Sequence, residues 1–227
     1  MTKIFLDSVD IKEIEYWNNL GVIAGVTTNP ALLSSYKNED PINLVKKISK
    51  IIYPYPVSVQ LTAKSKNDQI SQAKYFHKIN KNIVVKVPAF EKYLDLMKDL
   101  KNLKIKTNIT LCFDPITALL FAKTGATYVS MIIGRIDDFN LGDESLVERT
   151  RKIFDNTAVT TKIIAASFRY PKQFEKAITS GADIVTVPPK TLRMSLENHL
   201  SLGGFNDFSN KWNELPKKSR DKYEGNK

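Results

Sequence analysis

Apolar and polar positions follow one another along this chain in blocks that predict strands and helices in regular succession. Short apolar runs rich in Val and Ile are typical of strands buried on both faces. Between them lie longer stretches in which apolar residues recur three and four positions apart, as on one face of a helix. The predicted strands are Ile4–Asp7, Val22–Thr27, Val57–Leu61, Ile83–Val87, Ile105–Thr110, Thr127–Ile133, Ile163–Ala166 and Asp183–Val187.

Helical stretches separate these runs at fairly even spacing. They are Ile11–Leu20, a long region from Pro30 to Ile51, Ser65–Ile79, Glu91–Leu100, Pro115–Lys123, Glu144–Phe154, Pro171–Thr179 and Lys190–Leu196. Strict alternation of strand and helix predicts parallel strands and therefore the α/β class. Eight such units without a domain break predict a closed (β/α)8 TIM barrel over residues 1–200.

Glycines and the chain end add detail to this prediction. The similar runs Thr124–Thr127 and Ser180–Asp183 each contain Gly after a helix and predict helix C-cap turns at one end of the barrel. Phe205, Phe208 and Trp212 have helical spacing and predict an extra C-terminal helix over residues 201–216. This aromatic stripe would pack on the barrel itself or on a neighbouring subunit. Residues 217–227 are expected to form a solvated tail.

Composition narrows the class of protein. The 227 residues include 42% hydrophobic residues, which is a globular composition, and no apolar run reaches the length of a membrane span. The single cysteine cannot form an internal disulfide, which favours a cytoplasmic protein. The net charge of +10 would suit nucleic acid or anionic metabolites. Because the lysines are scattered and no nucleic-acid motif is present, we expect no nucleic-acid partner and mostly solvated helix faces.

Lys86 is the residue that first suggests chemistry. It interrupts the apolar run Ile83–Val87, where the side chain would be buried. Burial lowers the pKa of an amine, and a neutral lysine attacks carbonyl groups to form a Schiff base. The alternative is a lysine near the strand end that extends its amine into water.

Polar residues at the ends of the other predicted strands bear on this choice, since the active sites of such barrels lie at the C-terminal ends of the strands. They supply a carboxylate, amides, hydroxyls and two guanidinium groups. These residues are Asp7, Thr27, Asn29, Gln60, Asn108, Thr110, Ser130, Arg135, Ser167 and Arg169. Their convergence favours a nucleophilic Lys86, and two arginines on neighbouring strand ends would suit a phosphate group.

Each of these residues also has a simpler interpretation. Asp7, Asn29 and Ser167 could cap the helices that follow them, and the arginines could pair with surface acids such as Asp137. Other chemistries fit less well. The two histidines lie in helical stretches, which argues against a catalytic triad. No metal-ligand spacing and no Gly-rich nucleotide motif is found, so we expect neither a metal nor a cofactor.

A set of motifs in one order resembles the small transaldolases and fructose-6-phosphate aldolases, from residue 3 to about residue 213. The motifs are Ile4–Asp7, Gly25–Pro30, Val84–Pro88, Lys106–Thr110, Gly125–Ser130, Gly134–Asp138, Ala165–Arg169 and Gly181–Pro189. The resemblance implies transfer of a dihydroxyacetone unit between sugar phosphates, in the pentose phosphate pathway, without metal or cofactor. Implied substrates are fructose 6-phosphate, sedoheptulose 7-phosphate, erythrose 4-phosphate and glyceraldehyde 3-phosphate.

The resemblance also implies a role for each matching residue. Lys86 is the Schiff-base lysine, and Asp7 takes the proton from the C4 hydroxyl as the C3–C4 bond breaks. Thr110 helps to hold the catalytic water. Dihydroxyacetone hydroxyls are held by Asn29 and Ser130, and the phosphate by Arg135, Ser167 and Arg169. The C-terminal helix of the family docks on a neighbouring subunit, which implies a homo-oligomer such as a pentamer or decamer.

Two positions separate the branches of this family. Transaldolases generally carry glutamate, which handles the catalytic water, where this chain has Gln60. The aldolase branch carries glutamine there, together with a tyrosine where this chain has Ile132. Ser130 and Arg169 follow the transaldolase pattern. We therefore favour a transaldolase, with a fructose-6-phosphate aldolase and a weakly active sugar-phosphate-binding homologue as the alternatives.

Overall fold

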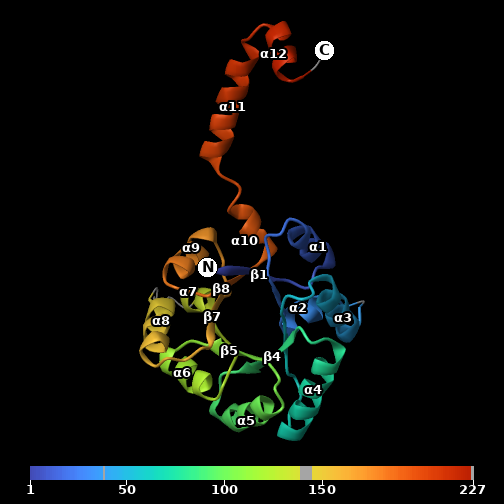
Figure 1. Ribbon diagram of the computed structural model, residues 1–227, viewed down its shortest axis with the longest axis vertical. Coiled ribbons are helices and arrows are strands. Elements are labelled where there is room, and N and C mark those ends of the chain that lie inside the picture. The colour runs from blue at the N-terminus through green and yellow to red at the C-terminus, as the bar shows by residue number, and fades with distance from the viewer. Residues whose placement is uncertain (38, 139–144, 226–227) are drawn as a thin grey trace. The chain divides into compact units, whose positions relative to one another are not determined.

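Eight parallel strands close into a barrel in the computed structural model, which describes residues 1–37, 39–138 and 145–225. Each strand pairs with the next in the sequence, and the last pairs with the first, so the predicted TIM barrel is confirmed (Figure 1). The strands are β1 (Lys3–Asp7), β2 (Val26–Thr27), β3 (Val57–Gln60), β4 (Ile83–Pro88), β5 (Thr107–Cys112), β6 (Tyr128–Ile132), β7 (Lys162–Ala166) and β8 (Ile184–Val187).

Helices enclose the strands on the outside of the ring (Figure 1). They are α1 (Ile11–Asn19), α2 (Pro30–Ser35), α3 (Pro41–Ile51), α4 (Lys66–Ile79), the 3₁₀ turn η1 (Glu91–Tyr93), α5 (Leu94–Asn102), α6 (Pro115–Lys123), α7 (Ile133–Asp138), α8 (Leu146–Asn156), α9 (Pro171–Thr179) and α10 (Pro189–Met194). Asp10, Asp40 and Asp114 begin α1, α3 and α6 by accepting hydrogen bonds from backbone N–H groups of the first turn.

The differences from the predicted elements concern their bounds. The predicted strand Val22–Thr27 is regular only over Val26–Thr27, and the long region before Ile51 divides into α2 and α3. The predicted helix Glu91–Leu100 begins with a 3₁₀ turn. Glu144, the expected start of α8, lies outside the described residues. The sequence pattern did not predict α7, a short helix that directly follows β6.

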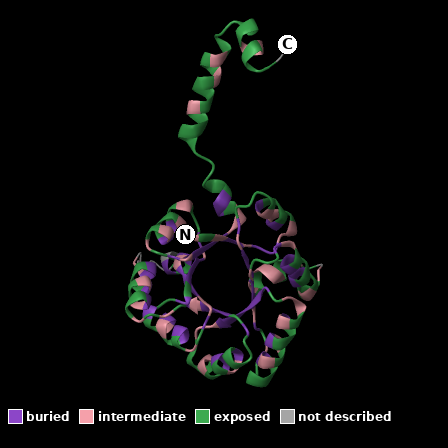
Figure 2. Ribbon diagram, in the orientation of Figure 1, coloured by how far each residue is buried: buried purple, intermediate pink, exposed green. Residues whose placement is uncertain are grey.

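Buried residues line the strands and the helix faces turned toward them (Figure 2). Inside the barrel, the rings of Phe5 and Tyr128 pack edge to face, with their centroids 6.4 Å apart. Phe5 also packs with Ile164 and Ile184. Gly25 permits this arrangement, because a Cβ atom there would lie 2.6 Å from the Phe5 ring. These side chains fill the interior below the polar residues at the strand ends.

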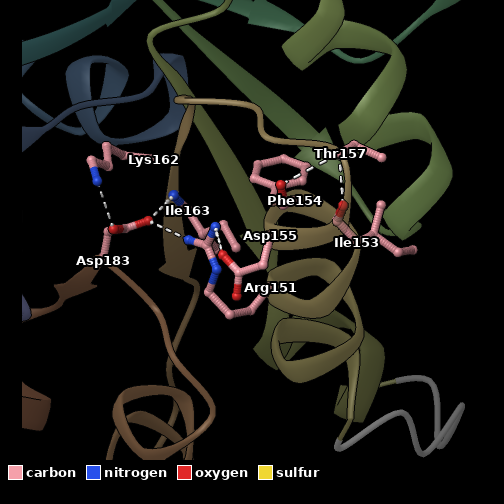
Figure 3. Close-up of polar contacts among 8 residues, drawn as sticks. All are labelled: Arg151, Ile153, Phe154, Asp155, Thr157, Lys162, Ile163 and Asp183. Carbon is pink, nitrogen blue, oxygen red and sulfur yellow. Dashed lines mark hydrogen bonds and ion pairs between the residues drawn. The ribbon is translucent and has the colours of Figure 1, made fainter.

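The two Gly turns have the predicted C-cap geometry. Gly125 and Gly181 adopt φ angles of +94° and +90°, and their N–H groups donate to the carbonyls of Ala122 and Ile178. The same end of the barrel carries an ionic network (Figure 3). There the Asp183 carboxylate accepts hydrogen bonds from the Ile163 N–H at 2.8 Å, from Lys162 and from Arg151.

A second compact unit, Leu192–Lys227, follows the barrel unit Met1–Thr191. It contains α11 (His199–Asn213) and α12 (Lys217–Tyr223). Trp212 packs edge to face on Tyr223 of α12, at 4.9 Å between centroids. Residues 217–223, where a solvated tail was expected, are helical, and none of them is buried. Phe205 and Phe208 of the predicted stripe are left exposed by the residues of this unit.

None of the helices in the described ranges is both long enough and apolar enough to cross a membrane.

Candidate active site

Three polar residues occupy one row across neighbouring strands at the barrel mouth. Gln60 on β3 is in register with Lys86 on β4, and Lys86 is in register with Asn108 on β5. Residues in register on adjacent strands present their side chains to the same face of a sheet. The amides of Gln60 and Asn108 therefore flank the Lys86 amine.

Lys86 is only 7% exposed, so the alternative of an amine extended into water is wrong. Its Nζ atom donates a hydrogen bond of 3.0 Å to the backbone carbonyl of Thr28. Burial lowers the pKa of this amine, and the Asp7 carboxylate partly opposes that shift. The neutral amine, which is the nucleophile of Schiff-base chemistry, is thus more accessible here than on an exposed lysine.

Asp7 lies at the end of β1 and is bonded to the adjacent strand. Thr27 on β2 donates a hydrogen bond of 2.7 Å to the Asp7 Oδ1 atom. The Thr27 hydroxyl lies 2.6 Å from the hydroxyl of Thr186 on β8. Burial raises the pKa of the Asp7 carboxyl, while Lys86 and the Thr27 hydrogen bond each lower it. A part-buried acid and a buried amine therefore perturb each other inside the barrel.

A second chain of polar side chains crosses the interior beside this pair. Ser130 on β6 donates a hydrogen bond of 2.7 Å to the Asn108 Oδ1 atom. The Asn108 Nδ2 atom donates at 3.1 Å to the hydroxyl of Ser58 on β3. Asn108 is fully buried, and its bonds fix the Ser130 hydroxyl with its hydrogen turned toward Asn108. Ser130 is left with acceptor capacity toward the mouth.

Thr110 is buried on β5, in register with Pro88 at the end of β4. Directly after it, Leu111 adopts a positive φ of 57°, and the register between β5 and β6 shifts between Ile109 and Cys112. Such irregularities bend a strand and re-aim its side chains, and they are frequent beside active sites.

The capping interpretation holds for one of the three residues to which it was applied. Asn29 begins α2, and its Oδ1 atom accepts from the Leu32 N–H at 2.9 Å. Asp7 does not cap a helix, because Asp10 begins α1. Ser167 does not cap α9 either, where the Gln173 side chain accepts from the backbone of Arg169 and Tyr170.

The two predicted phosphate-binding arginines lie on neighbouring segments at the mouth. Arg135 is exposed on α7, and Arg169 is exposed after β7. Arg169 forms an ion pair of 2.6 Å with Asp138 and also donates to the carbonyl and the hydroxyl of Ser167. The acid that pairs with Arg169 is thus Asp138; the side chain of Asp137 lies outside the described residues.

Gly134 joins these two segments. A Cβ atom on Gly134 would lie 1.8 Å from the Ser167 carbonyl oxygen, far inside any permitted contact. Ser167 itself adopts φ +70°, a left-handed conformation that is uncommon for a residue with a side chain. Close backbone packing at Gly134 therefore brings α7 and Arg135 next to Ser167 and Arg169.

A cavity of about 490 Å³ opens beside Gln60. Its walls come mainly from residues of α2, α3 and α4, and Gln60 and Thr62 stand at its edge. The Gln60 side chain therefore borders open space as well as the row of Lys86. Within the described ranges, no group of three His, Cys, Asp or Glu side chains has an arrangement that could hold a metal ion.

Four residues of the site were not predicted as site residues: Ser58, Gly134, Asp138 and Thr186, although the last three lie in the motifs Gly134–Asp138 and Gly181–Pro189. Strand periodicity could have revealed two of them, since Ser58 lies two positions before Gln60 and Thr186 interrupts an apolar strand as Lys86 does. No local signal marks Gly134 or Asp138 for contact with residues of β7 and the segment that follows it.

Comparisons with known proteins identify the family of the chain. The family described as "Transaldolase/Fructose-6-phosphate aldolase" matches residues 4–222. A "Probable transaldolase" of Geotalea uraniireducens (strain Rf4) is 39% identical over 95% of this chain and 100% of its own length.

Two further relatives carry the same description. That of Clostridioides difficile (strain 630) is 40% identical over 92% of this chain and 96% of its own length. That of Thermoplasma volcanium is 36% identical over 94% of this chain and 96% of its own length. The chain belongs to the transaldolase/fructose-6-phosphate aldolase family.

Proposed function

We propose that this protein is a transaldolase that transfers a dihydroxyacetone unit between sugar phosphates through a Schiff base on Lys86. The observation that carries the proposal is the burial of Lys86 in the barrel beside the Asp7 carboxyl. Relatives at about 39% identity that are described as probable transaldolases support it.

In this mechanism the neutral Lys86 amine adds to the C2 carbonyl of a ketose phosphate, water leaves, and the imine takes up a proton from solvent to give an iminium ion. Asp7 then takes the proton of the C4 hydroxyl, a C4 carbonyl forms, and the C3–C4 bond pair moves toward the iminium nitrogen. The aldose phosphate leaves, and the enamine on Lys86 attacks the aldehyde carbon of an acceptor while Asp7 returns its proton to the new hydroxyl. Water then hydrolyses the iminium ion and releases the product ketose phosphate. Because the iminium ion is itself the electron sink, these steps are routed through protein side chains.

Binding roles follow from the positions of the other residues. The phosphate would be held by Arg135, Ser167 and Arg169, in the charge-assisted bonds that guanidinium groups form with phosphate. Asn29 and Ser130 would bind the dihydroxyacetone hydroxyls, and Thr110 and Gln60 would hold the water that forms and breaks the imine. Asn108 acts through Ser130, whose hydroxyl it orients.

Trapping the Schiff base tests this proposal. The protein is incubated with fructose 6-phosphate and borohydride, and its peptides are weighed. We expect an adduct on Lys86 that is lost in Lys86→Ala and kept in Lys106→Ala, a control lysine exposed at the start of β5. An unmodified protein, or a label on another residue, would contradict the proposal.

A fructose-6-phosphate aldolase is the second candidate, and Gln60 favours it. An amide in register with Lys86 cannot act as the acid or base that a glutamate would supply. Release of free glyceraldehyde 3-phosphate without an acceptor would identify an aldolase. Strict dependence on erythrose 4-phosphate would identify a transaldolase. Imine formation without turnover would identify a sugar-phosphate-binding homologue.

The remaining expectations are also proposals. Exposed Phe205 and Phe208 on α11 suit docking on a second copy of this chain, as a pentamer or decamer. A cytoplasmic location is supported by the single cysteine, Cys112, whose pKa burial raises to about 12. A thiol of this kind stays protonated and unreactive.

A further inference from the structure

Two buried hydroxyl groups connect β8 to the Asp7 carboxyl. The side chain of Thr186 lies 2.6 Å from the Thr27 hydroxyl, which donates at 2.7 Å to Asp7 Oδ1. Thr186 and Thr27 are 2% and 1% exposed. In the described part of the chain, the Thr186 side chain has no hydrogen-bond partner other than Thr27. Thr186 was not among the residues predicted for the site from the sequence.

Counting hydrogens fixes the direction of this chain. A hydroxyl group has one hydrogen to donate and two lone pairs to accept with. Because Thr27 gives its hydrogen to Asp7, the hydrogen in the Thr186–Thr27 contact must come from Thr186. The order is therefore Thr186 to Thr27 to Asp7, and every donor in it is satisfied.

We propose that Thr186 is a positioning residue that holds the Thr27 hydroxyl in the orientation that donates to Asp7 Oδ1. This inference rests on the proposed function, in which Asp7 is the base for carbon–carbon bond cleavage. A chain of hydrogen bonds that all point toward a carboxylate polarises along its length and stabilises the ionised acid.

The same count assigns separate tasks to the two oxygens of Asp7. A proton on Oδ1 would make Thr27 an acceptor from Asp7, and one hydrogen of the Thr27–Thr186 pair would then lack an acceptor in this chain of hydroxyls. A buried hydroxyl group without a hydrogen-bond partner lowers the stability of the folded protein. Among the described residues Oδ2 accepts no hydrogen bond, so Oδ2 is the atom that takes the proton from the C4 hydroxyl.

The charged surroundings of Asp7 are simple. Lys86 on β4 acts on its carboxyl, and the strands that flank β1 supply the two hydroxyls. Neither Val26–Thr27 of β2 nor Ile184–Val187 of β8 contains a charged side chain. A change at Thr186 therefore alters the Asp7 environment without altering any charge.

Thr186→Val removes the hydroxyl and keeps the shape of the side chain, while Thr186→Ser keeps the hydroxyl. We expect Thr186→Val to lower kcat about fivefold, which corresponds to loss of one hydrogen bond. The acid limb of the kcat/KM profile should rise by about half a pH unit, because the pKa of Asp7 rises when the donor chain is broken. Thr186→Ser should restore both values.

Thr150→Val is the matched control. Thr150 is fully buried on α8, and its hydroxyl donates to the Leu146 carbonyl at 2.7 Å, away from the mouth. Thr150→Val replaces a hydroxyl group by a methyl group, as Thr186→Val does, and should leave the pH profile of kcat/KM unchanged. Thermal denaturation verifies that each variant is folded, and Thr186→Ala serves if the valine variant does not fold.

Borohydride trapping separates the two proposals. If wild type and Thr186→Val both trap the ketose on Lys86 and have the same kcat and the same acid limb of the kcat/KM profile, the inference about Thr186 is wrong. If wild type does not trap the ketose at all, the proposed function fails instead. The inference is supported if wild type and Thr186→Val trap the ketose equally, the acid limb of the kcat/KM profile is shifted in Thr186→Val, and Thr186→Ser has the acid limb of wild type.

Discussion

Replacing Gly134 by alanine should damage the proposed phosphate site more than it damages the fold. The added Cβ would lie 1.8 Å from the Ser167 carbonyl oxygen and 3.4 Å from the Arg169 Cγ atom. Since real Cβ atoms essentially never approach another heavy atom within 3.0 Å, α7 and the segment after β7 must separate by roughly 1 Å or more. Arg135 moves with α7, and Ser167 with the other segment.

The size of the effect follows from that displacement. Overpacking of this kind typically costs about 1–3 kcal/mol of unfolding free energy. Misplacement of a binding group by about 1 Å can cost about a hundredfold in rate. We therefore expect kcat/KM for fructose 6-phosphate to fall by about 10- to 100-fold, mainly through a higher KM. Imine formation with dihydroxyacetone, which has no phosphate, should change little.

Steady-state kinetics with the phosphorylated donor and borohydride trapping with dihydroxyacetone measure the two effects. Gly21→Ala is the control, because Gly21 has φ +68° and an added Cβ would meet nothing within 4 Å. It strains the backbone by about 1–2 kcal/mol without touching the site. An equal loss of both activities in Gly134→Ala, or a similar loss in Gly21→Ala, would refute the reasoning.

Four further predictions test other parts of the molecule. The Asp7 carboxylate raises the pKa of Lys86, so Asp7→Asn should lower that pKa and extend borohydride trapping to lower pH; an unchanged trapping profile would contradict the coupling. Gln60→Glu should raise transfer between sugar phosphates or shift its pH optimum, and kinetics without either change would show that the water is held elsewhere. Asp183→Asn should cost about 1–3 kcal/mol in chemical denaturation, because it removes the negative charge that Arg151 and Lys162 share in the network of Figure 3, although Arg151 keeps its ion pair with Asp155. Phe208→Asp should convert a homo-oligomer to smaller species on sizing, and a monomeric wild type at micromolar concentration would exclude α11 docking.

Periodicity in the sequence was enough to predict the barrel and the position of its mouth. Alternating strands and helices permit few topologies, and a parallel barrel places all strand ends on one side. Lys86 could therefore be related to Asp7 and Ser130 before any contact was known. The Gly125 and Gly181 turns were also predictable, because a helix C-cap has a local backbone requirement.

Contacts between distant segments were not predictable in this way. The Thr27–Thr186 bond joins residues 159 positions apart across β1, and no local pattern indicates that their hydroxyls meet. The contact of Gly134 with Ser167 depends on α7, a short helix with a weak sequence signal. A residue that contributes to a site only through contact with another strand or loop can be identified only once the structure shows that contact.

The hydrogen bonds at the barrel mouth treat its two central charges differently. Lys86 donates to the Thr28 carbonyl, a bond that both the ammonium group and the neutral amine can make and that the ammonium group makes more strongly. Asp7 instead accepts from the Thr27 hydroxyl, which favours the ionised carboxylate. Burial opposes charge on both groups, and for each of them it is the largest influence on the pKa. The arrangement thus lets the amine lose its proton next to a carboxyl whose ionised form accepts from Thr27, and a neutral amine and an ionised acid are the two states that carbon–carbon cleavage through a Schiff base requires.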